Sequence, residues 1–190
     1  MPKKRIALFI SGKGTNAMNL INYFNKSEKV IIAAVLSTKE NETVESLCKE
    51  NRILFEYKGN KTIEADELVH FCKENNVDWI VLAGFLKKIP EELVHTFRNK
   101  IINIHPSLLP DFGGKGMYGM RVHEAVIEAE ANKSGITIHY VNEEFDKGEL
   151  IAQFETQITE DDTPTTLASK IHKLEMAFFP KVVEEIVLSN

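Results

Sequence analysis

Short apolar runs alternate with amphipathic segments along the first half of the chain. Each run is nearly continuous and ends in small or polar residues, as expected of strands buried on both faces. The segments between the runs carry apolar side chains at helical spacing among charged residues, which is typical of amphipathic helices. The predicted strands lie at residues 5–10, 30–36, 54–57, 79–83 and 100–104. Strands that alternate with helices form parallel β-α-β units, so this half predicts a three-layer α/β fold with a mostly parallel sheet.

The pattern changes after Pro110. Residues 135–141 alternate between apolar and polar side chains and predict a half-buried strand, and residues 150–156 predict another. An antiparallel extension of the sheet accommodates this pair and its connection. The predicted helices lie at about residues 17–24, 42–50, 66–74, 121–131 and 164–188, with a further one that begins at Pro90. We find no internal repeat or linker and expect a single domain over residues 1–190, with halves at 1–110 and 111–190.

The charge balance narrows the possible partners. The chain has 190 residues with 23 basic and 28 acidic side chains, a formal net charge of −5. This mild acidity argues against a general binder of nucleic acid or of an acidic membrane. The apolar run after the basic first residues is too short for a signal-peptide core, so we expect a soluble, cytoplasmic protein. Cys48 and Cys72 have no spacing typical of zinc sites or disulfide frameworks and are expected to be buried.

A glycine-containing loop, residues 11–17, connects the first predicted strand to the first helix. Backbone N–H groups and the helix dipole create an anion site at such a turn, and Gly12 and Gly14 allow close approach of a ligand. Thr15 and Asn16 add hydrogen-bond donors, although Asn16 could equally cap the helix. The spacing Gly12-x-Gly14-x-x-Ala also fits a permissive dinucleotide fingerprint, but the acidic residue expected after the second strand is absent. The loop predicts phosphate binding, with a nicotinamide-cofactor module as the alternative.

The string Asn103-Ile-His105-Pro stands at the carboxyl end of the fifth predicted strand. Alternation along a strand directs the Asn103 and His105 side chains to the same face, and Pro106 ends the pairing there. An amide and an imidazole side by side can both donate hydrogen bonds to one oxygen that gains negative charge, as acyl transfer requires. Asp146 is the candidate carboxylate that would keep His105 charged and assist proton transfer, although spacing alone also fits a plain turn residue.

The remaining histidines and the absence of other motifs limit the chemistry. His139 is expected in the core or as a neighbour that supports the site, and the others, in helical segments, are expected mostly at the surface: His70, His95, His123 and His172. The chain has no Gly-x-Ser-x-Gly elbow and no cysteine near His105, so direct attack by a substrate amine is favoured over an acyl-enzyme. No ligand spacing predicts a metal site.

These motifs together resemble the phosphoribosylglycinamide formyltransferases, a family of folate-dependent enzymes with a Rossmann-like fold. The matching strings span nearly the whole chain: residues 11–16, 81–85, 103–110, 137–141, 145–148 and 175–180. The resemblance implies formyl transfer from 10-formyltetrahydrofolate to the amine of glycinamide ribonucleotide, without a metal. Asn103 and His105 would stabilise the tetrahedral oxyanion, and Asp146 would assist removal of the proton. Formyltetrahydrofolate deformylase and methionyl-tRNA formyltransferase share the Asn and His and are the alternatives within this group.

The resemblance also assigns binding residues. The phosphate and ribose would contact Gly12, Gly14, Thr15, Asn16 and Glu175, and Ser107 and His139 would support the catalytic groups. The folate would contact Phe85, Leu86, Lys87, Lys88, Ile89, Asn142, Glu143 and Phe145. The roles of His172, of Lys61 and of the loop at 111–120, a mobile segment or a lid over the amine substrate, are left open. We expect a monomer or weak homodimer that binds small molecules and neither nucleic acid nor a membrane.

Overall fold

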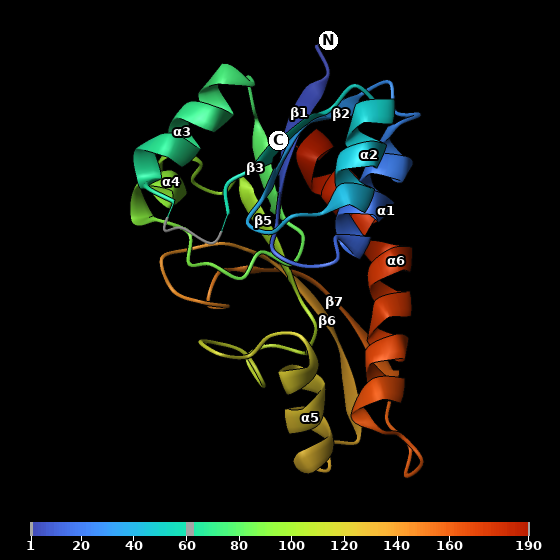
Figure 1. The fold of residues 1–190 in the computed structure, drawn as a ribbon. Coiled ribbons are helices and arrows are strands. Elements are labelled where there is room, and N and C mark those ends of the chain that lie inside the picture. The colour runs from blue at the N-terminus through green and yellow to red at the C-terminus, as the bar shows by residue number, and fades with distance from the viewer. Residues whose placement is uncertain (1, 60–62, 190) are drawn as a thin grey trace.

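A single seven-stranded sheet runs through the molecule (Figure 1). The computed structural model describes residues 2–59 and 63–189, and the strand order is β3-β2-β1-β4-β5-β6-β7. The five strands of the first half pair in parallel, and β6 and β7 extend the sheet in antiparallel fashion, as predicted. The strands are β1 (Lys4–Ile10), β2 (Val30–Ser37), β3 (Leu54–Tyr57), β4 (Trp79–Leu82), β5 (Ile101–His105), β6 (Lys133–Tyr140) and β7 (Leu150–Gln157).

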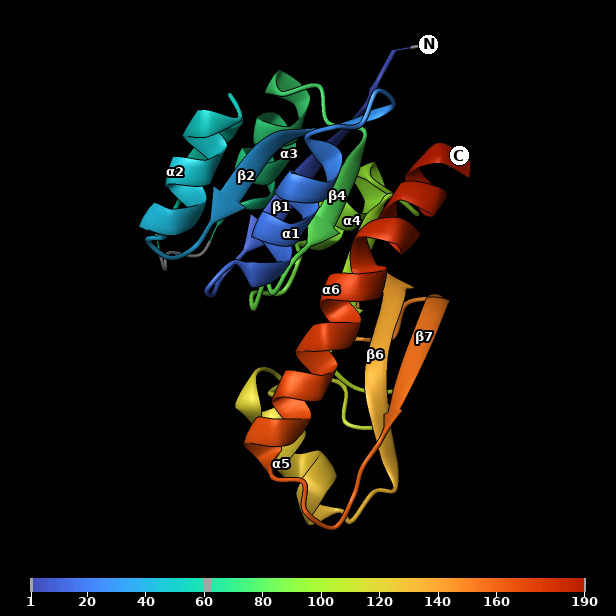
Figure 2. The same ribbon diagram turned by 90° about the vertical axis from the view of Figure 1, so that its right-hand side faces the viewer.

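Helices cover both faces of the sheet and form the outer layers. Side chains of α1, α2, α5 and α6 pack in one apolar cluster with Ile6, Leu8 and Ile10, while those of α3 and α4 pack on the opposite face with Ala7 and Phe9. Figure 2 shows that the long α6 runs along both the parallel part and the β6–β7 extension, so one helix braces both halves. The helices are α1 (Thr15–Phe24), α2 (Glu42–Glu50), α3 (Ala65–Glu74), α4 (Glu91–Thr96), α5 (Met120–Glu128) and α6 (Pro164–Ser189).

The strand predicted at residues 135–141 is confirmed as part of β6, but the prediction that it is half-buried is wrong. Residues 134–139 of β6 are all buried. Ile136 and Ile138 belong to the apolar cluster under α6, whereas the polar face of the strand lies beneath the turn that follows β5. On that face Thr137 Oγ1 donates to Ser107 O at 2.7 Å and accepts from Leu109 N at 2.9 Å. The alternation is real, but a loop covers the polar face and satisfies its hydrogen bonds.

The carboxyl ends of β1, β4 and β5 meet at one edge of the sheet. β1 lies between β2 and β4, so the strands before and after this point are added to the sheet in opposite directions, and open α/β sheets bind ligands at such a switch point. The loops are tied together through Ser11, whose backbone N donates to Gly84 O at 3.0 Å and whose Oγ accepts from Leu86 N at 3.1 Å. No helix among the described residues is long and apolar enough to cross a bilayer.

Candidate functional site

A cavity of about 680 Å³ opens at this edge of the sheet. Its volume lies within the range of small-molecule sites, roughly 300–1,000 Å³. Its wall combines the loops after β1, β4 and β5, the β6–β7 connection, the glycine-rich segment before α5, and one side chain of α6. Most of the predicted site residues line it: Gly12, Asn16, Phe85, Leu86, Lys87, Lys88, Ile89, Asn103, His105, His139, Asn142, Glu143, Phe145, Asp146 and Glu175.

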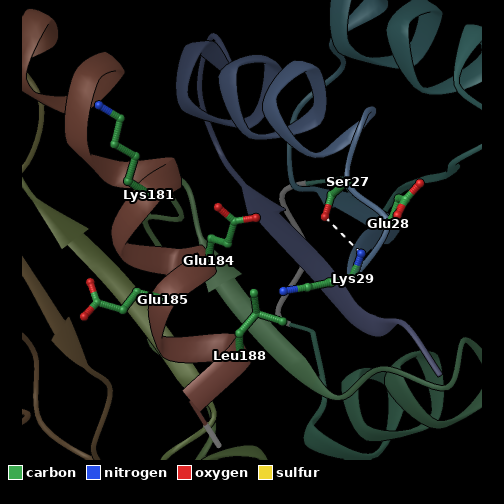
Figure 3. Close-up of a pocket in the computed structure, with 7 residues that line it drawn as sticks. All are labelled: Ser27, Glu28, Lys29, Lys181, Glu184, Glu185 and Leu188. Carbon is green, nitrogen blue, oxygen red and sulfur yellow. Dashed lines mark hydrogen bonds between the residues drawn. The ribbon is translucent and has the colours of Figure 1, made fainter. Parts of the chain in front are cut away.

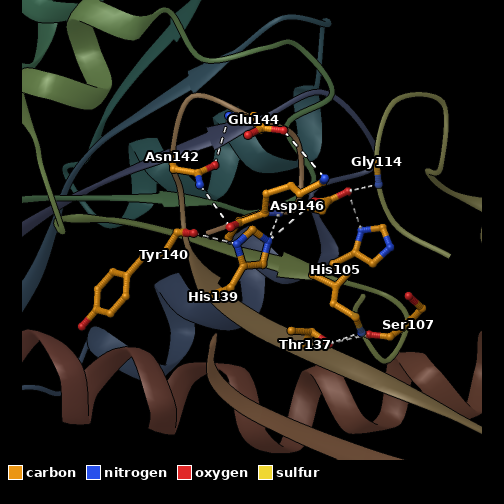
Figure 4. Close-up of polar contacts among 12 residues, drawn as sticks. His105, Ser107, Gly114, Thr137, His139, Tyr140, Asn142, Glu144 and Asp146 are labelled. Carbon is orange, nitrogen blue, oxygen red and sulfur yellow. Dashed lines mark hydrogen bonds and ion pairs between the residues drawn. The ribbon is translucent and has the colours of Figure 1, made fainter. Parts of the chain in front are cut away.

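Asn103 is held by a cross-strand neighbour. It pairs with His139 in the antiparallel register of β5 and β6, and its Nδ2 lies 3.0 Å from His139 Nε2. His139 Nδ1 lies 2.7 Å from Tyr140 O, which can only accept, so this nitrogen carries the ring hydrogen (Figure 4). Nε2 is then an acceptor and takes one hydrogen of the Asn103 amide. The second amide hydrogen faces the Asp146 carboxylate, at 3.4 Å, and the cavity.

His105 stands between two acceptors. Its Nε2 lies 2.8 Å from Phe112 O, and its Nδ1 lies 3.4 Å from Asp146 Oδ2. The sequence suggested that His105 and Asp146 act together but could not show that they are in contact. Ser107 steadies the same turn, because its Oγ donates to Asp111 O at 2.8 Å. Ser107 is fully buried and does not reach the cavity, so any part it plays is through this turn.

Protonation of His105 differs from the expectation that Asp146 keeps the ring charged. Burial lowers the pKa of His105 below its ordinary value, and the nearby His139 acts in the same direction. The Asp146 carboxylate and the Phe112 carbonyl oppose this shift without cancelling it. The ring is therefore neutral in the unliganded chain near neutral pH, although both of its neighbours are ready to accept a hydrogen. Such a ring can take up a second proton, because each of its two nitrogens then donates to its own acceptor.

Asp146 occupies a constrained position on the β6–β7 connection. Its backbone has a φ of 56°, in the left-handed region that is uncommon for residues other than glycine. Its Oδ2 accepts from Gly114 N at 2.9 Å, which ties the glycine-rich segment to the site. Burial alone would raise the pKa of Asp146, but contacts with His139, His105 and the Gly114 N–H lower it overall. The carboxylate is thus ionised and positioned to accept a proton from a ligand.

Only some residues of the predicted phosphate loop line the cavity. Gly12 and Asn16 line the cavity, whereas Gly14 is buried behind them as the N-cap of α1 and Thr15 is exposed outside the cavity wall. Asn16 is the second residue of the helix and does not cap it; its side chain is hydrogen-bonded to Glu175. Burial raises the pKa of Glu175, while Asn16 and His172 oppose that shift.

Gly14 has two structural reasons to be glycine. Its φ is 75°, and an added Cβ would lie 2.5 Å from Cγ2 of the buried Val44. We expect Gly14→Ala to lower the free energy of unfolding by about 2–4 kcal/mol, through backbone strain and overpacking. Gly59→Ala is the matched control, because Gly59 has a φ of 70° but its nearest atoms would lie 3.7 Å away. Equal losses for both variants in urea unfolding would show that the Val44 contact is irrelevant.

We refer to the part of the cavity wall at Asn16 and Glu175 as the Asn16–Glu175 arm; the part that follows β4 contains the apolar side chains of Phe85, Leu86 and Ile89. Phe85 packs against Phe9 with ring centroids 5.5 Å apart, so its ring belongs to the core as well as to the cavity wall. At the rim, His95 Nε2 lies 3.2 Å from Glu143 Oε1 and links α4 to the β6–β7 connection. His172 is half-exposed, with Nδ1 3.5 Å from Glu175 Oε2. Lys61, whose role the sequence leaves open, lies outside the described residues.

His123 is the residue that sequence reasoning missed. The helical histidines were expected mostly at the surface, but only 6% of His123 is exposed, and it lines the cavity. His70, His95 and His172 are exposed as expected. The signal was present in the spacing, since His123 lies beside Val122 and three positions before Val126, on the buried stripe of α5. The glycine-rich segment, residues 113–119, also contributes to the wall from Gly114 onward.

The buried histidines predict a pH-dependent stability. Burial lowers the pKa of both His105 and His123 from 6.5. The unfolded chain therefore binds more protons below pH 6.5, and stability falls as the pH drops from 6.5 towards the folded pKa values. Each histidine removes at most about 1.4 kcal/mol per pH unit in that window. Urea unfolding at several pH values should show a shallower acid loss for His123→Leu than for the unaltered chain; parallel curves would contradict it.

A second hollow, of about 510 Å³, lies between α6 and the turn after α1 (Figure 3). It is lined mainly by exposed charged side chains and contains none of the predicted site residues: Ser27, Glu28, Lys29, Lys181, Glu184, Glu185 and Leu188. Among residues 2–59 and 63–189, no three histidine, cysteine or acidic side chains gather in a way that could hold a metal ion. The chemistry of the described residues is concentrated in the first cavity.

Comparison with known proteins shows which family the chain belongs to. A family model described as formyl transferase matches residues 4–183. The chain is 38% identical to a chloroplastic phosphoribosylglycinamide formyltransferase of Arabidopsis thaliana, over 96% of the chain and 66% of that protein's length. It is 34% identical to the phosphoribosylglycinamide formyltransferase of Bacillus subtilis, over 98% and 96%. The crystal structure of the Bacillus halodurans protein of that name superposes with a TM-score of 0.87 at 34% identity, covering 97% of this chain and 95% of that one.

Proposed function

Because the chain belongs to the formyl transferase family, we propose that it is a phosphoribosylglycinamide formyltransferase of purine biosynthesis. It transfers the formyl group of 10-formyltetrahydrofolate to the amine of glycinamide ribonucleotide. The observation that carries the proposal is the convergence of Asn103, His105 and Asp146 on one cavity that also contains the glycine loop after β1. The first three residues fit acyl transfer, and the loop fits a phosphorylated acceptor.

The reaction begins when the acceptor amine attacks the formyl carbon. A carbon–nitrogen bond forms, and the carbonyl oxygen gains negative charge. Two donors on the cavity wall stabilise this oxygen: the Asn103 amide hydrogen that faces Asp146 in the unliganded chain, and a protonated Nδ1 of His105. Collapse of the tetrahedral centre returns the electron pair, breaks the bond to the folate nitrogen and releases tetrahydrofolate.

Proton transfer couples His105 to Asp146. An aliphatic amine with a pKa near 8 is mostly ammonium at neutral pH and must lose a proton before it attacks. The ionised Asp146 accepts this proton and relays it to neutral His105, 3.4 Å away. One transfer thus produces both the free amine and the cationic donor that stabilises the oxyanion. After the attack the acceptor nitrogen loses a second proton, the folate nitrogen takes up one proton as it leaves, and His105 returns its proton to solvent once the product has formed.

The two arms of the cavity separate the two substrates. The Asn16–Glu175 arm takes the phosphoribosyl part, because backbone N–H groups at the start of α1 suit an anion and a carboxylate suits ribose hydroxyls. The arm with Phe85, Leu86 and Ile89 takes the flat pterin ring, which apolar walls suit. The same cavity is lined by the other proposed folate contacts, Lys87, Lys88, Asn142, Glu143 and Phe145. Gly14 and Thr15 act through the fold of the loop.

Location and assembly belong to the same proposal. The cytoplasmic location stays a prediction from the sequence, and plant relatives of this chain are named as chloroplastic. We retain the proposal of a monomer or weak homodimer that acts on small molecules, without nucleic acid, membrane or metal. Size-exclusion chromatography over a range of concentrations distinguishes monomer from dimer.

Steady-state release of tetrahydrofolate tests the proposed activity. The purified chain, given 10-formyltetrahydrofolate, should release tetrahydrofolate only when glycinamide ribonucleotide is also present. Release at the same rate without the ribonucleotide would identify water as the acceptor and a deformylase instead. Release that requires a charged methionyl-tRNA and ignores the ribonucleotide would identify the other alternative. Binding of both ligands without release would also contradict the proposal.

A further inference from the structure

The environment of His123 does not satisfy its imidazole. Its Nδ1 is fully enclosed, and it has no hydrogen-bond partner among the described residues. A buried histidine with a purely structural role is expected to be paired, because burying an unpaired polar group costs about 1–3 kcal/mol. The described residues contain three such buried, unpartnered side-chain atoms, Asn16 Oδ1, His123 Nδ1 and Ser134 Oγ. Both Asn16 and His123 belong to the wall of the main cavity.

The helix that carries His123 packs beside the helix that carries Glu175. His123 lies on α5, which packs against α6, the helix that carries Glu175. It is also close enough to His105 for a charge on one ring to disfavour a charge on the other. His123 therefore lies near His105 and lines the same cavity as Asn16 and Glu175. His123 lies on α5, whereas none of the three catalytic candidates lies on a helix.

The ring is neutral and has one hydrogen to place. Burial lowers the pKa of His123, and His105 lowers it further. Nδ1 has no acceptor beside it, so the hydrogen is better placed on Nε2. Nε2 is not one of the enclosed, unpartnered atoms, and the residue borders the cavity, so this nitrogen is the one available to a ligand. A neutral N–H suits an uncharged oxygen better than it suits a phosphate, for which a cation is favoured.

Resting on the proposed function, we propose that His123 is a binding residue for the acceptor substrate. Its Nε2–H donates to an uncharged oxygen of the phosphorylated amine, the amide carbonyl or a ribose hydroxyl, between the attacking nitrogen and the phosphate. The residue thereby helps to select the acceptor and makes no contact with the folate.

Isothermal titration calorimetry on three proteins tests this. The unaltered chain, His123→Leu and His123→Gln are each titrated with glycinamide ribonucleotide and, separately, with tetrahydrofolate. Leucine removes the donor while filling the space, so the Kd for the ribonucleotide should rise about tenfold. Glutamine keeps an N–H at a similar reach and should stay within about threefold. The Kd for tetrahydrofolate should not change, and thermal unfolding confirms that each variant is folded.

The outcomes separate this inference from the proposed function. Unchanged ribonucleotide affinity in His123→Leu would overturn the role of His123, as would equal weakening of both ligands. An unaltered chain that does not bind the ribonucleotide overturns both proposals, whereas one that binds it without turnover overturns the activity alone. If His123→Leu does not fold, nitrogen NMR of the unaltered chain decides. The His123 ring signal, assigned with His123→Gln, should shift with the ribonucleotide and not with tetrahydrofolate; no shift would overturn the inference.

Discussion

Replacing His105 with alanine is expected to lower kcat by roughly 100- to 1,000-fold, the usual loss when one donor to a developing oxyanion is removed. The variant loses the imidazole that takes up the proton and donates to the oxyanion, while Asn103 and the substrate-binding arms remain. The KM for each substrate should therefore change far less than kcat. Initial rates of tetrahydrofolate release, at varied concentrations of each substrate, measure both quantities.

The control for this variant is His70→Ala. His70 lies on α3 with its side chain 71% exposed, is paired with Glu74 on the same helix, and is not among the residues that line the cavity. Its removal should leave kcat within twofold and the unfolding temperature nearly unchanged. A His105→Ala enzyme that is folded and retains a near-normal kcat would show that the imidazole does not take part in the reaction.

Gly148→Ala is expected to lower kcat by about 100-fold through the position of Asp146. An added Cβ at Gly148 would lie 1.6 Å from Tyr140 O, a backbone atom of β6 that cannot move aside cheaply. The β6–β7 connection must shift instead, and Asp146 lies two residues away on it. A misplacement of about 1 Å in a reacting group can cost roughly this factor. Rates and urea unfolding of the variant, measured together, separate lost activity from lost fold.

Lys147→Ala is the matched control for Gly148→Ala. Lys147 lies between Asp146 and Gly148, and its side chain is 68% exposed, so truncation leaves the backbone path unchanged. We expect it to retain the activity of the unaltered chain. Full activity of a folded Gly148→Ala would mean that the connection tolerates the shift and that the position of Asp146 is not critical.

The elements of the parallel half follow from local sequence. Short apolar runs that end in Ser-Gly or Ala-Gly favour buried strands, and β2, β3 and α2 begin where the pattern places them. The Asn103-Ile-His105-Pro string predicted where the site lies, because alternation along a strand directs the first and third side chains to the same face and proline ends the strand. These inferences need only neighbours in the chain.

Features that depend on distant neighbours could not be predicted in the same way. The burial of β6 depends on a turn, residues 106–110, that folds over Thr137. The direction of the His105 pKa shift depends on how deeply the ring is buried, which cannot be read from the spacing of residues in the sequence. His123 could not be singled out among the helical histidines expected mostly at the surface, because a helix pattern alone does not say which side of a helix meets a cavity. The contact of Asp146 with His105 needed the register of β5 against β6 and the close approach at Gly148.

A single turnover with 10-formyltetrahydrofolate labelled with ¹³C at the formyl carbon tests the central claim most directly. The enzyme, in excess over the labelled folate, is mixed with glycinamide ribonucleotide and quenched, and the carbon is located by NMR. The label should appear in full as the formyl amide of the ribonucleotide. Label recovered as formate, or attached to the protein, would contradict direct transfer to an amine held beside Asn103, His105 and Asp146.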